Sequence, residues 1–218
     1  MIKLACLTLW LSFPGLALAG SKPDSAEPTL TGLTMAFGLG FGVGDGQLQK
    51  PDGPNPPDPI ASHQIPFSLG LGYRPIPIIS LGVVLEVGPI DCSADCSGLD
   101  SRLGGEGRLH ITPNRSSSPW ISLGFGHEWY RTERTTWKGT LLASGYDIDL
   151  QVGYDLRISP HWTLGPSFGL RMGKYGSVYT YTRERGGTPR EADIPIANQA
   201  THGWFVFGLR LAGTRSKR

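Results

Sequence analysis

The sequence predicts an all-β protein, an eight-stranded antiparallel up-and-down barrel that crosses a membrane. The main observation is a strict alternation over residues 33–43, where apolar side chains at every second position are separated by Thr, Ala or Gly. Successive side chains of a strand point to opposite faces, so this segment has one apolar and one nearly bare face. The pattern returns seven more times, with connections that alternate between long and short. Short periplasmic turns and longer extracellular loops are typical of bacterial transmembrane barrels.

The eight alternating runs can be followed in order along the chain. They cover residues 31–44, 62–73, 78–87, 101–112, 120–131, 140–158, 162–182 and 201–211. The first long connection is rich in proline, which excludes a helix or a central strand there, and the last is a long polar loop over residues 183–198. A tilted spanning strand needs about 9–11 residues. The sixth and seventh runs are longer, so we expect their hairpin to project as a sheet edge that could bind a partner by strand addition.

The first 19 residues resemble a cleaved signal peptide. Lys3 supplies the positive start, residues 4–13 are mostly apolar, and Ala17 and Ala19 match the small-x-small rule for cleavage before Gly20. The apolar stretch is shorter than the ~20 residues of a spanning helix, which disfavours the alternative of an uncleaved anchor. We therefore expect a signal peptide at 1–19, a flexible segment at 20–30, the barrel at 31–211 and a basic tail at 212–218.

Composition narrows the function classes. The formal net charge is only +2, which gives no support for nucleic-acid binding. The mean hydropathy of −0.14 fits a soluble protein, but also a membrane barrel, whose strands are apolar at alternate positions only. The glycine-rich run at 38–44 is no nucleotide fingerprint because no helix start follows it. We expect no cofactor.

Two cysteines follow the signal peptide, Cys92 and Cys96, in a predicted loop over residues 91–99. An exported protein meets an oxidising compartment, so we expect a small loop disulfide between them. A metal site is the weaker alternative, because two thiols without a nearby His make half a site.

The face of the predicted strands opposite the apolar one carries most of the charged residues. We expect these side chains to form a polar network in the lumen: Glu86, Arg102, Glu106, Arg108, Glu128, Asp147, Asp149, Asp155, Arg157, Arg171 and Arg210. The cations among them are all arginine, whose planar fork pairs with carboxylates in two-point geometry. Eight strands enclose a lumen just wide enough for side chains, so we expect a plug. Glycines on the same face leave room for the long side chains.

Aromatic residues gather near the ends of the runs. The strongest candidates for two interfacial girdles are Tyr73, Trp120, Trp129, Tyr146 and Trp162. An amphipathic ring suits the headgroup region, although aromatics also favour strands for other reasons.

Five histidines raise the alternative of catalysis. His63, His127 and His202 are predicted near the extracellular rim, with Ser62, Ser144 or Ser177 as partners for a Ser-His-acid set. No local motif links them, and His110 and His161 are predicted near periplasmic turns. We therefore expect no enzyme activity and treat these residues as interface or loop histidines.

The signal peptide, the eight runs and turns such as Ser159-Pro-His-Trp together resemble the small outer-membrane β-barrel proteins of Gram-negative bacteria, the OmpA- and OmpX-type barrels. The resemblance implies location in the outer membrane, with outer-membrane lipids and the assembly machinery as partners. We expect a structural or surface-interaction role, with an extracellular or envelope protein as a partner for the long loops. The alternatives are a narrow solute or ion pore and a lipid-modifying enzyme.

Overall fold

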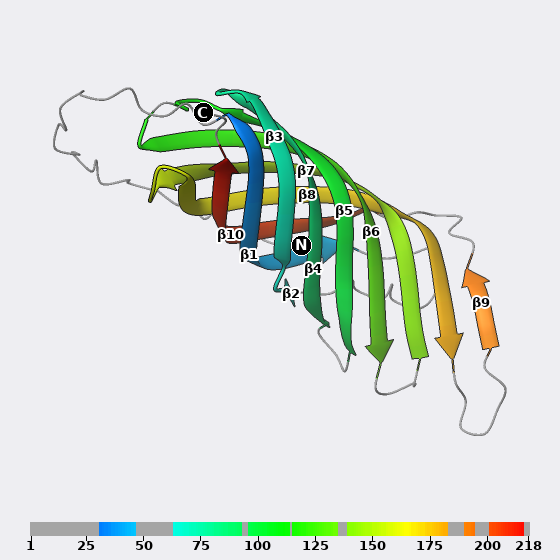
Figure 1. The fold of residues 1–218 in the computed structure, drawn as a ribbon. Coiled ribbons are helices and arrows are strands. Elements are labelled where there is room, and N and C mark those ends of the chain that lie inside the picture. Colours follow the sequence, from blue (N-terminus) through cyan, green and yellow to red (C-terminus); the bar gives the residue numbers. More distant parts are fainter. Residues whose placement is uncertain are drawn as a thin grey trace, which may run out of the picture.

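The computed structural model describes residues 31–46, 63–92, 96–113, 115–134, 139–182, 190–194 and 201–215, which fold into a closed antiparallel barrel (Figure 1). Its strands are β1 (Gly32–Gly46), β2 (His63–Gln64), β3 (Phe67–Ile76), β4 (Ile79–Cys92), β5 (Cys96–His110), β6 (Ser117–Arg134), β7 (Gly139–Arg157), β8 (Trp162–Thr182), β9 (Arg190–Ile194) and β10 (Thr201–Arg215). Closure comes from β10, which pairs with β1 on one side and β8 on the other.

The wall contains eight strands because β2 and β3 are two parts of one. Both lie between β1 and β4, and they are separated by Ile65 and Pro66. Proline has no backbone N–H for the ladder, which explains the interruption. The carbonyl of Pro66 still accepts from Gly40 N at 2.9 Å, so the wall stays continuous. The predicted eight-stranded antiparallel barrel is confirmed.

One segment of the predicted polar loop at 183–198 is strand instead. Here β9 pairs with the far end of β8, from Val178 opposite Ile194 to Thr182 opposite Arg190, and Figure 1 shows it beside that end. The physical reason is an open edge, because β10 begins opposite Lys174 and leaves the rest of β8 without its barrel neighbour.

Several strands extend beyond their predicted ends. The prediction of a loop at 91–99 was wrong for most of its length, since β4 reaches Cys92 and β5 begins at Cys96. The barrel also ends later than predicted. β10 runs to Arg215, opposite Leu33, because the start of β1 needs a partner along its edge. The predicted signal peptide, the flexible segment and the last three residues lie outside the described residues.

The outer surface of the barrel is apolar and exposed. On β7 and the residue after it, seven outward side chains from Tyr146 to Ile158 are each at least 39% exposed. At a rise of ~3.4 Å per residue and a tilt of ~40°, this band is about 30 Å tall, the thickness of a bilayer's hydrocarbon core. No helix in the described part of the chain is long and apolar enough to cross a membrane.

Candidate functional site: the charged interior

The inner face of the barrel carries the predicted charges. All eleven predicted lumen residues share the inner phase of their strands; eight are buried, and Glu106, Arg157 and Arg210 are half-buried. Strand pleating explains this placement, because the residues between them are the exposed apolar side chains of the outer band. The buried charges form two layers, which differ in their position along the strands.

The first layer lies toward the long-loop end and is defined by Glu86, Asp100, Arg102, Glu128, Asp147, Asp149, Arg171 and His202. Arg102 Nε donates to Asp147 Oδ1 at 2.7 Å. Arg171 bridges two carboxylates, with Nη2 at 2.6 Å from Glu86 Oε1 and Nη1 at 3.9 Å from Asp100 Oδ2. Such charge-assisted contacts are strong in a desolvated site because the low dielectric strengthens them.

Aromatic side chains cover this layer on its long-loop side. The Nε2 atom of His202 lies 2.5 Å from Glu128 Oε2, and the Tyr175 hydroxyl donates to Glu128 Oε1 at 3.4 Å. Tyr175 also stacks on the His202 ring at 4.2 Å between centroids. Trp204 and Tyr130 are buried beside them, which closes this end of the layer to solvent.

The second layer lies toward the short-turn end and is defined by Arg74, Glu106, Arg108, His110, Trp120, Asp155, Arg157 and Arg210. Arg108 Nη2 donates to both oxygens of Glu106 at 3.0 Å. Arg210 Nη1 lies 3.3 and 3.4 Å from the two oxygens of Asp155. Each of these ion pairs joins two residues of the same layer.

Trp120 is predicted in an interfacial girdle, and this prediction was wrong. Its side chain is only 2% exposed and lies inside the barrel, where Nε1 donates to Asp155 Oδ1 at 3.1 Å. The Arg108 guanidinium carbon lies 4.1 Å from the centre of the Trp120 ring. Trp120 shares the inner phase of β6 with Ser122, and the lumen offers both an acceptor for its N–H and a cation for its ring face.

The other girdle candidates lie on the outer surface. Tyr73, Trp129, Tyr146 and Trp162 are between 38% and 62% exposed; Tyr146 lies near the middle of β7, and the other three lie closer to a strand end. Their role as an interfacial girdle stays a prediction.

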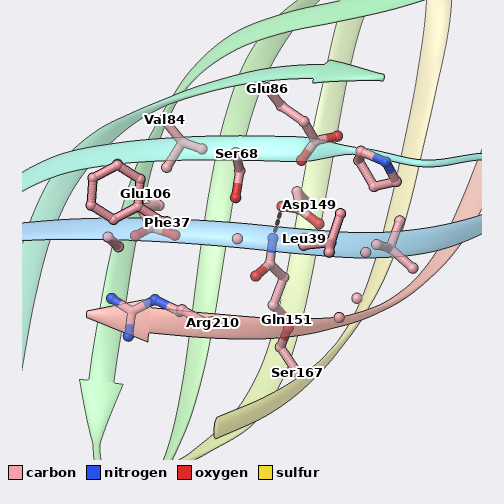
Figure 2. Close-up of a pocket in the computed structure, with 18 of the residues that line it drawn as sticks. Phe37, Leu39, Ser68, Val84, Glu86, Glu106, Asp149, Gln151, Ser167 and Arg210 are labelled. Carbon is pink, nitrogen blue, oxygen red and sulfur yellow. Dashed lines mark hydrogen bonds between the residues drawn. The ribbon is translucent and has the colours of Figure 1, made fainter. Parts of the chain in front are cut away.

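Glycines form the opposite wall of the interior. A cavity of about 70 Å³ lies between the glycine faces of β1, β8 and β10 and the charged side chains of both layers. Figure 2 shows Glu86, Asp149, Gln151 and Arg210 around it, with Gln151 Nε2 donating to Asp149 Oδ2 at 2.5 Å. A second cavity of about 30 Å³ lies nearer the short turns. Both are lined by Ala36, Gly70, Glu106 and Arg210.

The structure places the histidines of the candidate Ser-His-acid set on both faces of the barrel wall. His202 is buried against Glu128 rather than placed at a loop rim, because it occupies the inner phase of β10. His127 lies on the outer wall, edge-on to Trp129 and Tyr146 at 4.6 and 4.7 Å. Ser144 and Ser177 hydrogen-bond to each other at 2.8 Å.

The remaining histidines are equally dispersed. His63 is exposed and packs on Phe41, His161 is exposed in a turn, and His110 is buried in the short-turn layer with Nε2 3.3 Å from Ser80 Oγ. Ser62 lies outside the described residues.

The two cysteines are directly opposite in the register of β4 and β5. Directly opposed residues of an antiparallel pair have Cα atoms ~4.5–5.5 Å apart, a separation that a disulfide accepts. The disulfide between Cys92 and Cys96 stays a prediction. Within the described ranges, no group of three His, Cys, Asp or Glu side chains is placed to hold a metal ion.

Sequence reasoning missed several interior residues. Asp100 shares the phase of Arg102, but the predicted strand begins one residue later and so leaves it out of the lumen. Arg74 falls in a predicted turn, and Tyr175 and Trp204 carry no charge that would mark them as lumen residues. Extending each alternation by a residue or two would have found Asp100 and Arg74.

Comparison with solved structures identifies the architecture. OprG, an outer membrane protein from Pseudomonas aeruginosa, superposes with a TM-score of 0.57 over 88% of this chain and 100% of its own, at 10% identity. The chain has the fold of a small outer-membrane β-barrel. Neisserial surface protein A agrees, with a TM-score of 0.53 and 11% identity over 83% of this chain and 96% of its own. No protein-family model and no curated protein sequence matches the chain.

Proposed function

We propose that this protein is an exported outer-membrane barrel with a structural or surface-interaction role, anchored by its lipid-facing wall and closed to solutes along its lumen. The observation that carries the proposal is the filled interior. Two layers of buried and half-buried charged side chains, several of them in ion pairs, and an aromatic cover occupy the space that a pore would need. An eight-stranded barrel has just enough internal room for such side chains.

The apolar outer band supports the membrane location. Dozens of large apolar side chains are exposed on the outer wall, including Leu123, Phe125 and Leu209 at 58–61%. In water such a surface would be an aggregation hazard, whereas lipid matches it. The predicted signal peptide supports export, and the 9–11-residue requirement of a spanning strand is met by every wall strand when β2 and β3 count as one.

The surface role follows from what projects beyond the lipid band. The start of β7 and the end of β8 stay paired beyond Tyr146 and Lys174, and β9 pairs with the same end of β8, so a three-stranded edge projects above the apolar band on the long-loop side. In this proposal that side faces outward, and its partners are extracellular or envelope proteins. We propose no catalytic role, since the histidines of the protein are dispersed among the lumen, the outer wall and the turns.

Conductance in planar lipid bilayers tests the closed lumen. We expect the purified barrel to insert without steady openings, whereas discrete and reproducible current steps would establish a narrow pore along the glycine wall.

Location and orientation are tested by an epitope tag inserted within residues 52–58. Antibody binding to intact cells and heat-modifiable mobility of the outer-membrane fraction are expected, and recovery in the soluble periplasm would contradict the proposal. Mass spectrometry of lipid A with and without the gene tests the enzyme alternative.

A further inference from the structure

The two charged layers have opposite surpluses of charge. The long-loop layer contains five carboxylates and two arginines. In the short-turn layer Arg74, Arg108 and Arg210 outnumber the carboxylates Glu106 and Asp155. A plug made only of matched pairs would need neither surplus. A buried charge without a counter-charge destabilises the fold because water no longer solvates it. A negatively charged partner bound in the short-turn layer would therefore be stabilising.

Arg74 shows the surplus most directly. It is 5% exposed, and its guanidinium donates to the carbonyl of Pro77 through Nε at 2.8 Å and through Nη2. A carbonyl is a dipole and does not neutralise the charge. Within the described part of the chain, no carboxylate forms an ion pair with Arg74.

Two further arginines converge on the same region. The guanidinium carbons of Arg108 and Arg210 lie 4.1 and 5.7 Å from the centre of the Trp120 ring, so two like charges share one indole. Arg108 is 4% exposed, and its Nε and Nη1 atoms make no hydrogen bond within the described residues. Their carboxylate partners, Glu106 and Asp155, supply one negative charge each.

The cavity nearest the short turns lies beside two of these arginines, Arg74 and Arg210. It measures about 30 Å³ and is lined by Arg74, His110 and Arg210 together with the hydroxyl-bearing residues Ser80, Thr34 and Thr214. Asp155 and Glu106 also line it, each already paired with an arginine. A volume of this size accepts one or two water-sized groups, which excludes a nucleotide, a sugar or a lipid headgroup.

We propose that this cavity is a binding site for a small inorganic anion of chloride size, held by Arg74 and Arg210 with donors from the surrounding hydroxyls. The anion neutralises part of the positive surplus in the short-turn layer and so stabilises the barrel. The proposal does not depend on whether the lumen is closed, which conductance decides separately.

Bromide is the probe for the site. Crystals of the refolded barrel grown with bromide in place of chloride should show an anomalous peak in the cavity between Arg74 and Arg210. In solution, the melting temperature should be about 3 °C higher in sodium chloride than in sodium gluconate at equal ionic strength, because gluconate is too large for the cavity. Peaks confined to the outer surface, or equal melting temperatures in the two salts, would overturn the proposal.

Matched variants locate the effect. Arg74→Gln should abolish the difference between chloride and gluconate, whereas Arg102→Gln removes a buried arginine from the other layer and should keep it. Loss of the difference in both variants would show that the anion effect is not specific to the cavity and would contradict the site. The two wild-type measurements decide the question even where a variant fails to fold.

Discussion

The Nε2 atom of His202 lies 2.5 Å from Oε2 of Glu128 inside the barrel, although 74 residues separate the two in sequence. The contact joins β6 to β10, which are not neighbours in the wall, so it crosses the lumen. A contact of this kind ties opposite parts of the barrel together through side chains alone. Its removal therefore tests how far the interior network stabilises the fold.

Glu128→Ala should destabilise the barrel strongly. The change leaves the His202 ring nitrogen and the Tyr175 hydroxyl without their shared acceptor in a site closed to water, at a cost of about 3 kcal/mol in the free energy of unfolding. Urea unfolding in lipid vesicles, followed by tryptophan fluorescence, measures the change. Glu133→Ala is the matched control, because its pair with Arg131 is 60% exposed at both ends and should contribute less than about 1 kcal/mol. Equal losses in the two variants would show that burial of the Glu128 contact adds nothing.

The position of Trp120 predicts a change in fluorescence quenching by lipid. Quenchers on brominated acyl chains reach Trp162 on the outer wall, whereas the barrel wall shields Trp120 inside. Trp162→Phe should lower the quenched fraction of the total emission, and Trp120→Phe should raise it. A fall in that fraction for Trp120→Phe would place its ring on the lipid side.

The same variant should affect stability. Trp120→Phe loses the hydrogen bond to Asp155 and weakens the contact with the Arg108 guanidinium, which together contribute about 1–2 kcal/mol. Urea unfolding of the two tryptophan variants gives the comparison, and Trp162→Phe should change the free energy of unfolding by less.

Strand number and facing could be predicted from the sequence because both follow from the period of two. A run such as residues 146–158 keeps its apolar members on one face whatever its partners are, so the charges between them must share the other face. The lumen set Glu86, Arg102 and Asp147 follows directly from that phase.

Strand ends and pairings could not be predicted in the same way. Beyond the lipid band nothing forces an apolar residue at every second position, so the strand β9 gave no alternating signal. Asp100 keeps the phase of Arg102 but lies just outside the strand that was predicted. The period of two places Trp120 with Ser122 on the inner face, and the girdle prediction was wrong because it followed the position of the ring near a strand end and not its phase. The period of two also does not predict which inner residues contact each other across the lumen. The stagger of the strands around the barrel determines those contacts, such as the one between Glu128 and His202.

The register of β4 and β5 sharpens the disulfide prediction. Because Cys92 and Cys96 are opposed, we expect the exported protein to lack free thiols. Alkylation before and after reduction, read by mass spectrometry, should show modification only after reduction. Cys92→Ser should lower the free energy of unfolding by no more than about 2 kcal/mol, because the bond closes a loop of only a few residues. Alkylation of both thiols in the unreduced exported protein would contradict the bond.

A glycine beside the network provides a steric test of the interior. A Cβ atom at Gly126 would lie 2.7 Å from Arg102 Nε and 2.9 Å from Cζ and Nη2. Gly126→Ala should therefore displace the guanidinium from Asp147 and lower the free energy of unfolding by about 1–3 kcal/mol. Gly105→Ala is the control on the adjacent strand, where the nearest atom to the new Cβ is the Gly82 carbonyl oxygen at 3.8 Å, an ordinary contact. If the two alanine variants unfold at the same urea concentration, the Arg102 side chain has room to move, and the interior is looser than its ion pairs indicate.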